Sequence, residues 1–466
     1  MTKPKIGLLP LYLELYDRAL PSARPRIEAF YATITSELGK KGLDVLTTAI
    51  CRLKNEFAAA IKSFEEAGAD CIVTLHLAYS PSLESAEALA KTKLPIIVLD
   101  TTPAYSYGPQ QDPDELIYNH GIHGVQDMCN MLIRNRKPFQ IEAGHWGKSD
   151  VLDRISAWAR VARIASRMRN ARVGRIGKPF EGMGDFAVPD DVLRSTIGIE
   201  VVQCDPKVIK SLVPPQDDPV VEEEIAADLE RFSADGVDPA AHRRSVRAGL
   251  AVRRWIEQKK LTAFTFNFLD IDRASGLPTV PFLEASKGMA REVGYAGEGD
   301  VLTAAFVGAL ASIHQDTTFT EMFCPNWEEE SIFLNHMGEM NTDLAVGKAV
   351  LVEKPMPWID ADPPVIAVGR FRGGNAVFLN LAPGPENAYT LIAAPITVLD
   401  VEGDEGMANS VRGWFRPAMP IADFLKEYSR AGGTHHAAMV YGDVAEDMIR
   451  FGKLMGWKTL ILANPQ

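Results

Sequence analysis

The feature that most constrains this fold is the alternation of apolar runs with amphipathic segments in the first hundred residues. We expect strands at residues 5–9, 43–48, 71–77 and 95–100, and helices near residues 24–39 and 54–68 and after Pro81. Apolar strands separated by helices form parallel sheets that are covered on both faces, with a ligand crevice outside the carboxyl ends of the strands. The pattern therefore predicts an α/β domain. No GxGxxG motif follows a strand, so a dinucleotide site is not indicated.

A helix rich in arginine, residues 150–170, separates this region from a second α/β unit. Its arginines are Arg154, Arg160, Arg163, Arg167 and Arg169. Because runs of charge usually face solvent, we interpret the helix as a solvated face or a subunit contact. In the second unit we expect strands at residues 171–177, 198–204 and 261–268 and helices near residues 220–234 and 240–259.

After about residue 340 the pattern changes to strands separated by turn residues. We expect strands at residues 348–354, 365–372, 375–381 and 389–401, then a helix at 421–431, a strand at 438–441, a helix at 444–455 and a strand at 458–462. The stretch from Arg372 to Asn375, with two glycines between, predicts a hairpin. This part of the chain is typical of an antiparallel sheet or small barrel.

The length and composition limit the classes of protein to consider. A chain of 466 residues is too long for one hydrophobic core, so two or three domains are expected. A net charge of −12 without a Lys/Arg run argues against nucleic acid and anionic membranes as partners.

No apolar run reaches about 18 residues, the length of a membrane span. The N-terminal residues lead into a strand and form no secretory segment. Five scattered cysteines without a CxxC pair fit a reducing cytoplasm.

Four short segments place acidic or imidazole side chains among glycines and apolar residues. They are residues 296–300 with Glu298, 319–323 with Glu321, 334–337 with His336, and 432–436 with His435 and His436. A carboxylate such as Glu321 close to Phe319 and Phe323 would be costly to bury unless it met a cation. A divalent metal explains all four segments together. Two carboxylates and two imidazoles suit Mn²⁺ and tolerate Co²⁺, Mg²⁺ or Zn²⁺, with positions left open for substrate oxygens.

Each segment also has a simpler interpretation. Glu298 could cap the helix that begins near Val301, although Asp300 is the expected cap. His336 could be a core histidine with satisfied hydrogen bonds, and the glycines before His435 could merely end a helix. The spacing contains no local ligand motif such as HExxH. Only the joint occurrence of the four segments favours a metal site.

The same four segments, in this order, resemble those of the L-arabinose isomerase family. Residues 294–300, GYAGEGD, are similar to its Gly-Phe-Ala-Gly/Ala-Glu-Gly-Asp segment, and residues 431–436, AGGTHH, to its Gly-Gly-Ala/Thr-His-His. Further landmarks in order are His120-Gly121, Gly144-His145-Trp146, Arg175 to Met183, and Trp414 to Pro417. The resemblance covers nearly the whole chain and is strongest at residues 290–340 and 410–440.

The resemblance implies a fold and an assembly. The fold is α/β, with N-terminal and central parallel-sheet domains and a C-terminal, mostly antiparallel β domain, which we place at residues 1–168, 169–315 and 316–466. Members of the family are hexamers with active sites between subunits. The expected partners are therefore a small sugar and further copies of this chain, as a homohexamer or trimer.

The resemblance also implies roles for individual residues. Glu298, Glu321, His336 and His436 would bind the metal, and His435, His120 and Met183 would line the sugar pocket. His120 would reach into the pocket of a neighbouring subunit. His435 is expected to contact a substrate hydroxyl while His436 faces the metal, since adjacent residues can point to opposite sides.

The expected activity is the interconversion of an aldose and its ketose through an enediolate, with Glu298 and Glu321 as the acid/base pair and their individual roles left open. Because the sequence departs from the family pattern at several positions, the identity of the sugar substrate is left open. Residues 319–323 read FTEMF where the family has Phe-Met-Glu-Asp-Tyr, no glutamine occurs at residues 9–13, and Ile117 stands where a glutamine is expected. The alternatives to L-arabinose are L-fucose, D-arabinose or a modified hexose, or a non-catalytic sugar-binding protein on the same scaffold.

Overall fold

A computed structural model describes residues 3–464; Met1 and Thr2, the start of the N-terminal segment considered above, lie outside the described residues. The chain divides into two compact units, Met1–Ser166 and Arg167–Gln466. The finer division at residues 168 and 315 stays a prediction. Within residues 3–464, no helix combines the length and the apolar character that crossing a bilayer requires.

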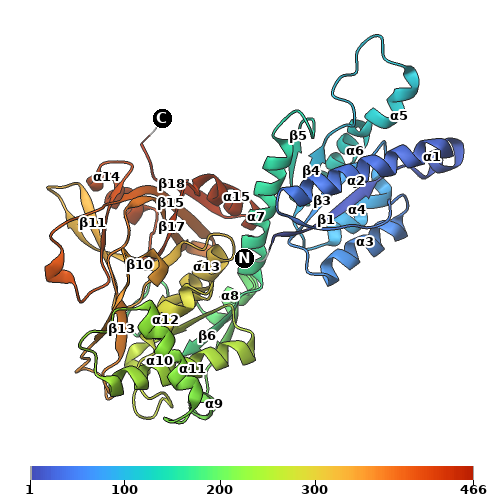
Figure 1. Cartoon of the computed structure of the whole chain (residues 1–466). Helices are drawn as coiled ribbons and strands as arrows, with labels where there is room; N and C mark the ends of the chain where they lie inside the picture. Colours follow the sequence, from blue (N-terminus) through green and yellow to red (C-terminus); the bar gives the residue numbers. More distant parts are fainter. Residues whose placement is uncertain (1–2, 465–466) are drawn as a thin grey trace. The chain divides into compact units, whose positions relative to one another are not determined.

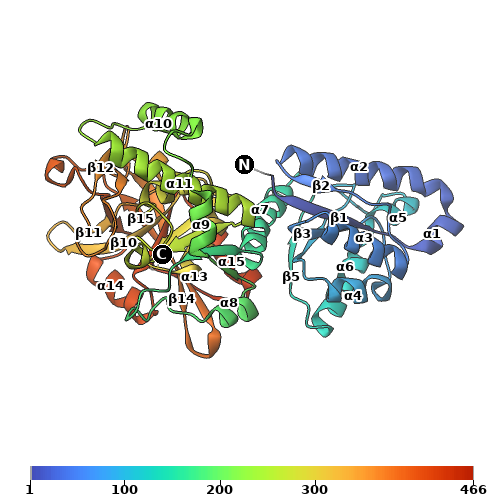
Figure 2. The same ribbon diagram turned by 90° about the horizontal axis from the view of Figure 1, so that it is seen from below.

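The first unit is built on a five-stranded parallel sheet with strand order β2-β1-β3-β4-β5. Its strands are β1 Lys5–Leu11, β2 Asp44–Leu46, β3 Cys71–His76, β4 Ile96–Asp100 and β5 Phe139–Ala143. The helices are α1 Glu14–Ala19, α2 Arg24–Lys40, α3 Lys54–Glu66, α4 Ser82–Lys91, α5 Leu116–Asn119, α6 Gly121–Arg134 and α7 Val151–Arg169. Helices α3, α4 and α6 pack side by side on one face and α2 lies on the other (Figure 2). The predicted parallel α/β fold is confirmed.

The arginines of α7 do not form the solvated face that their number suggested. Arg154 pairs with Glu142, with Nε 2.6 Å from Oε2. Arg163 lies 3.5 Å from Asp70, and both of these side chains are almost fully buried. The solvated-face interpretation is therefore wrong for Arg163, because a buried carboxylate of the same unit takes up its charge, whereas Arg154 stays partly exposed and Arg167 is exposed. The subunit-contact interpretation stays a prediction.

The second unit begins with a four-stranded parallel sheet, in the order β7-β6-β8-β9. Its strands are β6 Arg172–Ile176, β7 Glu200–Gln203, β8 Ala263–Phe266 and β9 Gly294–Gly297. The helices are α8 Asp190–Thr196, α9 Pro206–Leu212, α10 Pro219–Arg231, α11 Pro239–Lys259, α12 Phe282–Met289 and α13 Val301–Ala311. Every residue of α13 is buried. This helix contacts β6, β8 and β9 on one side and β10, β14 and β17 of the next sheet on the other (Figure 1).

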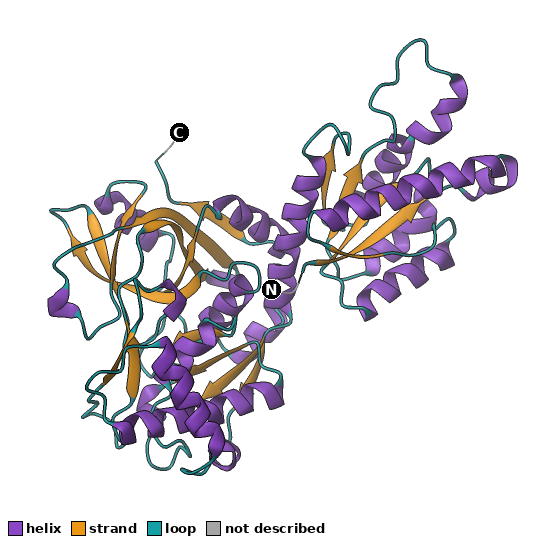
Figure 3. Ribbon diagram, in the orientation of Figure 1, coloured by secondary structure: helices purple, strands orange, loops and turns teal. Residues whose placement is uncertain are grey.

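The remainder of this unit is a seven-stranded sheet, in the order β14-β17-β10-β11-β16-β15-β18 (Figure 3, orange arrows). Its strands are β10 Thr317–Asn326, β11 Ser331–Asn335, β14 Gly374–Pro383, β15 Tyr389–Val398, β16 Gly413–Pro417, β17 His436–Tyr441 and β18 Lys458–Ile461. Because β14 also pairs with β15, six antiparallel strands close into a small barrel, and β18 is added parallel to β15. The predicted antiparallel C-terminal region is confirmed.

The other elements of the described residues are shorter or lie outside these sheets. Helices α14 Ile421–Arg430 and α15 Ala445–Met455 accompany the barrel. Strands β12 Val350–Glu353 and β13 Val365–Val368 form a separate antiparallel pair. The 3₁₀ helices are Pro21–Ala23, Pro113–Glu115, Phe268–Asp270, Thr342–Leu344, Pro385–Asn387 and Glu405–Met407.

The hairpin predicted between Arg372 and Asn375 is wrong. Strand β13, before this stretch, pairs with β12, whereas β14, after it, pairs with β15 and β17. The Gly373 N–H donates a hydrogen bond to Asp400 Oδ1 at 3.1 Å. A Cβ atom at Gly373 would lie 2.3 Å from the other oxygen of this carboxylate. Gly373 thus permits a close approach to Asp400 where the chain passes from one sheet to another.

Buried ion pairs join α10, α11 and α12 at the side of the second unit. The Lys287 ammonium contacts both Glu224 and Asp228, and its side chain is only 6% exposed. Asp228 also lies 3.1 Å from His242 Nε2, and Glu224 lies 2.6 Å from Arg253. Burial by itself would raise the pKa of Glu224, but the hydrogen bond from Arg253 and the charge of Lys287 outweigh it and lower the pKa to about 2.

Substitution of Lys287 by methionine should strongly destabilise the second unit, because it leaves Glu224 and Asp228 buried beside one another without their shared cation. Breaking a buried ion pair of this kind costs about 3–5 kcal/mol. Chemical denaturation followed by circular dichroism would measure the loss. Lys426→Met, which removes an exposed ion pair with Asp423, is the matched control and should have a much smaller effect. Equal effects of the two substitutions would contradict the importance of the buried pairs.

Candidate metal centre

Glu298 occupies the short connection between β9 and α13, at the carboxyl edge of the parallel sheet. Its φ of 63° lies in the left-handed region, which is unfavourable for a residue with a side chain. The preceding Gly297 must be a glycine, because a Cβ atom there would lie 2.8 Å from His336 Cε1. The backbone of this connection is therefore shaped so that strand, carboxylate and imidazole approach one another closely.

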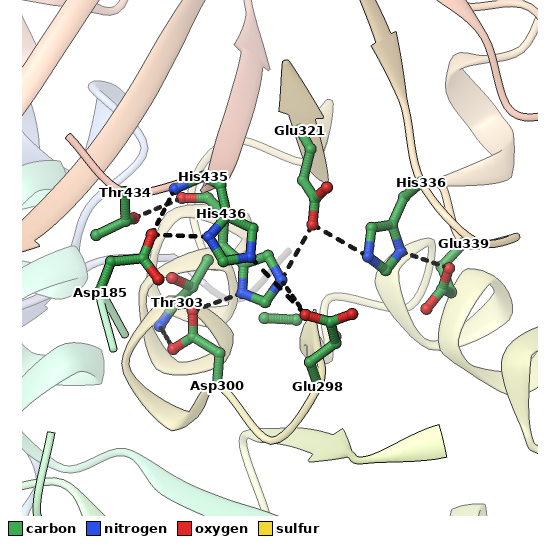
Figure 4. A network of polar contacts seen from close by, with 12 residues as sticks. Asp185, Glu298, Asp300, Thr303, Glu321, His336, Glu339, Thr434, His435 and His436 are labelled. Carbon is green, nitrogen blue, oxygen red and sulfur yellow. Dashed lines mark hydrogen bonds and ion pairs between the residues drawn. The ribbon is translucent and has the colours of Figure 1, made fainter. Parts of the chain in front are cut away.

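Strand pairing brings the other three predicted ligands together. Glu321 on β10 is directly opposite His436 on β17, and on its other side it is opposite Asn335, the last residue of β11 before His336. Glu321 Oε1 lies 3.0 Å from His436 Nε2 and 3.1 Å from His336 Nε2. Glu298 Oε2 approaches the same His436 nitrogen at 3.6 Å (Figure 4). Residues far apart in the chain thus converge on one point.

A carboxylate behind each imidazole orients the ring. His336 Nδ1 lies 2.7 Å from Glu339 Oε2, and the other oxygen of Glu339 accepts a hydrogen bond from the Tyr295 hydroxyl at 2.6 Å. His436 Nδ1 lies 2.9 Å from Asp300 Oδ2. A proton held between each Nδ1 and its carboxylate leaves the Nε2 lone pair directed at the centre, which is how metal-binding histidines are oriented.

The electrostatics of the centre favour a cation. Burial would lower the pKa of His336, but Glu339 and Glu321 raise it to about 10. Burial acts in the same direction on His436, yet its carboxylate neighbours, Asp300 first, raise its pKa well above the usual range. Despite burial, the nearby imidazoles of His435 and His436 lower the pKa of Glu298 to about 2. The surrounding carboxylates therefore attract positive charge to the buried imidazoles.

The donor atoms also fit a divalent metal. Glu298 Oε2 and His436 Nε2 are buried and form no hydrogen bond within residues 3–464; their neighbours there are the other ionisable side chains of the centre. Two sets of ligand atoms each lie within 4.8 Å of one another, and they share His436: one set adds Glu298 and His435, the other Glu321 and His336. Two carboxylates and two imidazoles form a mixed oxygen and nitrogen set suited to Mn²⁺ and its neighbours in the first transition row.

Aromatic rings enclose the imidazoles. The Phe319 ring meets His336 and His436 edge to face, with centroids 4.8 and 5.1 Å away, and Phe186 stacks on His436 at 4.8 Å. The expectation that Phe323 also lies close to Glu321 in an apolar setting is wrong, since its side chain is 47% exposed. A register shift in β10 between Met322 and Cys324 turns Phe323 outward.

His435 lies at the edge of the centre. Asp185 Oδ2 contacts His435 Nδ1 at 2.7 Å and accepts the backbone N–H of His435 at 2.9 Å. His435 Nε2 lies 3.8 Å from Glu298 Oε2. The rings of His435 and His436 are neighbours, with centroids 4.4 Å apart, and do not point to opposite sides as expected. The reason is that His435 precedes β17 and is not part of the strand.

The two other predicted pocket residues, His120 and Met183, belong to other parts of the chain. His120 belongs to the first unit, where its Nε2 lies 2.9 Å from the Tyr16 hydroxyl and its Nδ1 lies 2.8 Å from the Leu116 carbonyl oxygen. Met183 is half-buried in the loop before α8, two residues before Asp185. The structure therefore brings together Glu298, Glu321, His336, His435 and His436, while the roles of His120 and Met183 stay predictions.

The simpler interpretations of the segments can now be compared with the contacts. Asp300 is the cap of α13, as expected, because its side chain accepts the Thr303 N–H at 2.9 Å; Glu298 is not the cap. Gly432, with a φ of 86°, does end α14, and the chain then leads directly to His436. Asp300 and Gly432 thus each have two roles: each shapes the end of a helix, and each helps to form the centre.

The sequence did not predict the roles that four residues have at the centre: Asp185, Tyr295, Asp300 and Glu339. A weak signal was present for Glu339, which is acidic and three residues beyond His336. Asp300 had been assigned a role only as a cap, and nothing in the sequence links Asp185 with His435, which is 250 residues away. Such partners emerge only when the loops are placed in space.

Comparisons with known proteins all point to one family. The model of the L-arabinose isomerase central domain matches residues 222–316, and that of the L-arabinose isomerase C-terminal domain matches residues 316–458. The chain is 23% identical over 369 residues to an L-arabinose isomerase of Shouchella clausii, covering 75% of this chain and 72% of that protein. It is 26% identical to L-arabinose isomerase 2 of Bacillus licheniformis over 76% of both chains. With L-arabinose isomerase 1 of that organism it shares 25% identity over 86% of this chain and 83% of the relative.

Proposed function

Because the chain belongs to the L-arabinose isomerase family and is an aldose–ketose isomerase, we propose that it works at the metal centre of the second unit, with L-arabinose and L-ribulose as its sugar pair. The observation that carries the proposal is that Glu298 and Glu321 both approach His436 Nε2, while His336 Nε2 lies 3.1 Å from Glu321, so that two sets of ligand atoms meet at His436. Two carboxylates and two oriented imidazoles at one point supply both the ligands and the acid/base groups that this reaction needs.

The reaction moves one proton between C1 and C2 of the sugar and another between their oxygens. In the direction from aldose to ketose, one glutamate removes the C2 proton and the electron pair forms the C1–C2 double bond. The second glutamate carries the proton of the C2 hydroxyl to the carbonyl oxygen at C1, and the C2 carbonyl forms as the first glutamate returns its proton to C1. Glu298 and Glu321 are suited to these roles, because the neighbouring imidazoles hold both carboxylates in the ionised form in which each begins as a base.

The proposed cofactor is Mn²⁺, with Co²⁺, Mg²⁺ or Zn²⁺ as substitutes. Glu298, Glu321, His336 and His436 would hold it, and Asp300 would keep His436 in the required orientation. When bound, a divalent cation supplies the positive charge that polarises the sugar carbonyl and balances the charge that develops on oxygen. The mixed oxygen and nitrogen donor set supports this choice.

The proposed sugar pocket begins at His435, whose imidazole is held by Asp185 and faces Glu298 at the rim of the centre. Met183, on the same loop as Asp185, would add an apolar wall. We further propose that His120 contributes to the pocket of a neighbouring subunit in a homohexamer or trimer, and that the enzyme works in the cytoplasm. The scattered free cysteines support the last point.

A second candidate is the isomerisation of a different sugar, such as L-fucose, D-arabinose or a modified hexose. Ile117 and the segment from Leu9 to Leu13 favour it, because they lack the glutamines expected at sugar-contacting positions. A site that loses a hydrogen-bonding side chain changes its preference among sugars that differ in one hydroxyl. The non-catalytic alternative is set aside, since the chain is an isomerase.

Metal binding should stabilise the folded protein. After treatment with EDTA and dialysis, addition of Mn²⁺ should raise the melting temperature, because an ion at 100 times its Kd adds about 2.7 kcal/mol to the stability of the state that binds it. His336→Gln should abolish most of this rise. His314→Gln, a partly buried histidine beside Asp447 and outside the centre, is the control and should retain it. The same response in both variants would place the metal elsewhere.

Glu321→Gln should lower turnover by a factor of about 10³ or more, because the amide can neither accept the proton nor bind the cation with a full charge. Glu329→Gln, an exposed site on the turn after β10, should retain the activity of the unchanged protein. Ketose formation would be measured after circular dichroism and size-exclusion chromatography have shown that both variants are folded. Unchanged turnover in Glu321→Gln would remove the acid/base assignment.

A panel of sugars would identify the substrate. With Mn²⁺ present, we expect the highest kcat/KM with L-arabinose when ketose formation is measured for L-arabinose, L-fucose, D-arabinose and D-galactose. Ile117→Gln should then raise kcat/KM for L-arabinose by about tenfold or more, if the restored amide contacts a hydroxyl. Rapid turnover of another sugar, with none for L-arabinose, would favour the second candidate function.

A further inference from the structure

A cavity of the Arg167–Gln466 unit has four arginines among its twelve lining residues. Its volume is about 660 Å³, and its charged residues are Arg243, Arg244, Arg247, Asp272, Arg273 and Asp362. Three of the arginines project from α11, which packs beside α9 and α10 (Figure 2). None of the proposed metal ligands lines this cavity. It is therefore a site separate from the metal centre.

Two of these guanidinium groups retain hydrogen-bonding capacity. Arg247 donates through Nε to the Pro214 carbonyl oxygen at 2.8 Å, and no carboxylate within residues 3–464 forms an ion pair with it. Arg244 donates through Nη2 to the Pro363 carbonyl oxygen at 3.1 Å. Its Nε is buried without a hydrogen-bond partner among the described residues. Buried donors of this kind are normally satisfied, so an additional acceptor is expected.

The carboxylates of the cavity do not neutralise its arginines. Asp272 Oδ1 accepts the Ala274 N–H at 2.8 Å and so stabilises its own loop. Asp362 is shared, since it lies 3.9 Å from Arg244 Nε and 3.8 Å from Arg273 Nη2. Both distances are at the outer limit of an ion pair. Arg273 also pairs with Asp360 at 3.1 Å, and Arg243 pairs with Glu222, so the positive charge without a close carboxylate is that of Arg244 and Arg247.

The arginines also repel one another. Arg243 and Arg247 are four residues apart on α11, a spacing at which like charges destabilise a helix. Burial, and then the charge of Arg243, lower the pKa of Arg247. The charge of Arg243 is balanced by an ion pair with Glu222, whereas no carboxylate among residues 3–464 pairs with Arg247. An anion between these side chains would remove the repulsion and fill the open donor positions.

We propose that this cavity binds a small organic phosphate, with its phosphoryl group held by Arg244 and Arg247 and its carbon skeleton against Leu277 and Pro278. Guanidinium groups present planar forks of N–H donors that match phosphate oxygens, and several of them facing one cavity suit a tetrahedral dianion better than a single carboxylate. The volume is in the range of small-molecule sites, about 300–1,000 Å³. The first amides of α11 are not part of the site, because Asp238 caps those of Ala240 and Ala241.

Calorimetric titration of the full chain with glycerol 3-phosphate tests the proposal, with glycerol as the neutral control and inorganic phosphate as the probe without carbon. Glycerol 3-phosphate should bind more tightly than inorganic phosphate, and glycerol should not bind. Arg247→Gln should weaken the binding at least about tenfold, since a hydrogen bond to a charged group is lost. Arg254→Gln, which lies on the same helix and contacts Leu212 and Asp218 outside the cavity, should bind as the unchanged protein does.

Arg244→Gln serves as a second variant should Arg247→Gln fail to fold, and circular dichroism would check both. Equal affinity in the unchanged protein and in the folded variants would overturn the site. Equal affinity for inorganic phosphate and glycerol 3-phosphate would overturn the organic ligand. Absence of binding together with a changed oligomer mass in Arg247→Gln would overturn the proposal and assign the arginines to contacts between copies of the chain.

Discussion

The pairing of Glu321 with His436 across strands β10 and β17 is the contact on which the rest of the centre depends. The barrel fixes this register, and β11 adds His336 from the opposite side of β10. Helix α13, buried on all sides, joins the barrel to the parallel sheet and carries Glu298 and Asp300 at its start. Both sheets must therefore be in place before the four proposed ligands can meet. This arrangement explains why the centre is built from two subdomains of one compact unit and not from a local motif.

The centre combines features that would destabilise an ordinary protein core. It holds buried carboxylates close to one another, a glutamate with left-handed backbone geometry, and donor atoms without partners among the described residues. Each is unfavourable alone, and a bound cation would offset the electrostatic part of the penalty. The outer carboxylates of Asp300 and Glu339 contribute by fixing the rings of His436 and His336. Rigid support from strands and from these outer contacts is what allows a site of this kind to keep its geometry.

The second unit holds negatively charged side chains at the metal centre and positively charged side chains at the arginine-lined cavity, in two separate places. The first gathers carboxylates around a point, and the second gathers guanidinium groups around a larger volume. Arg253, on the same helix α11 as three of the cavity arginines, and Lys287, on α12, each have a close carboxylate partner. Arg244 and Arg247 differ, because carbonyl oxygens hold them and leave their charge in place.

Hydrophobic periodicity and glycine placement determined the parallel α/β character of the first two sheets and the antiparallel C-terminal region, because these depend on local patterns of burial. The same patterns did not predict strands β5, β9, β10, β11 and β16. The acidic and imidazole segments likewise identified the proposed ligands, since charged groups in apolar surroundings need a partner. The sequence did not determine which strands pair. Gly373 and Gly374 indicated a hairpin, yet β13 and β14 belong to different sheets. The outward turn of Phe323, the contact of Asp185 with His435 and the arginine-lined cavity also came from tertiary structure alone. Pairings between distant segments are selected by the packing of the whole unit, and no short stretch of sequence contains that information.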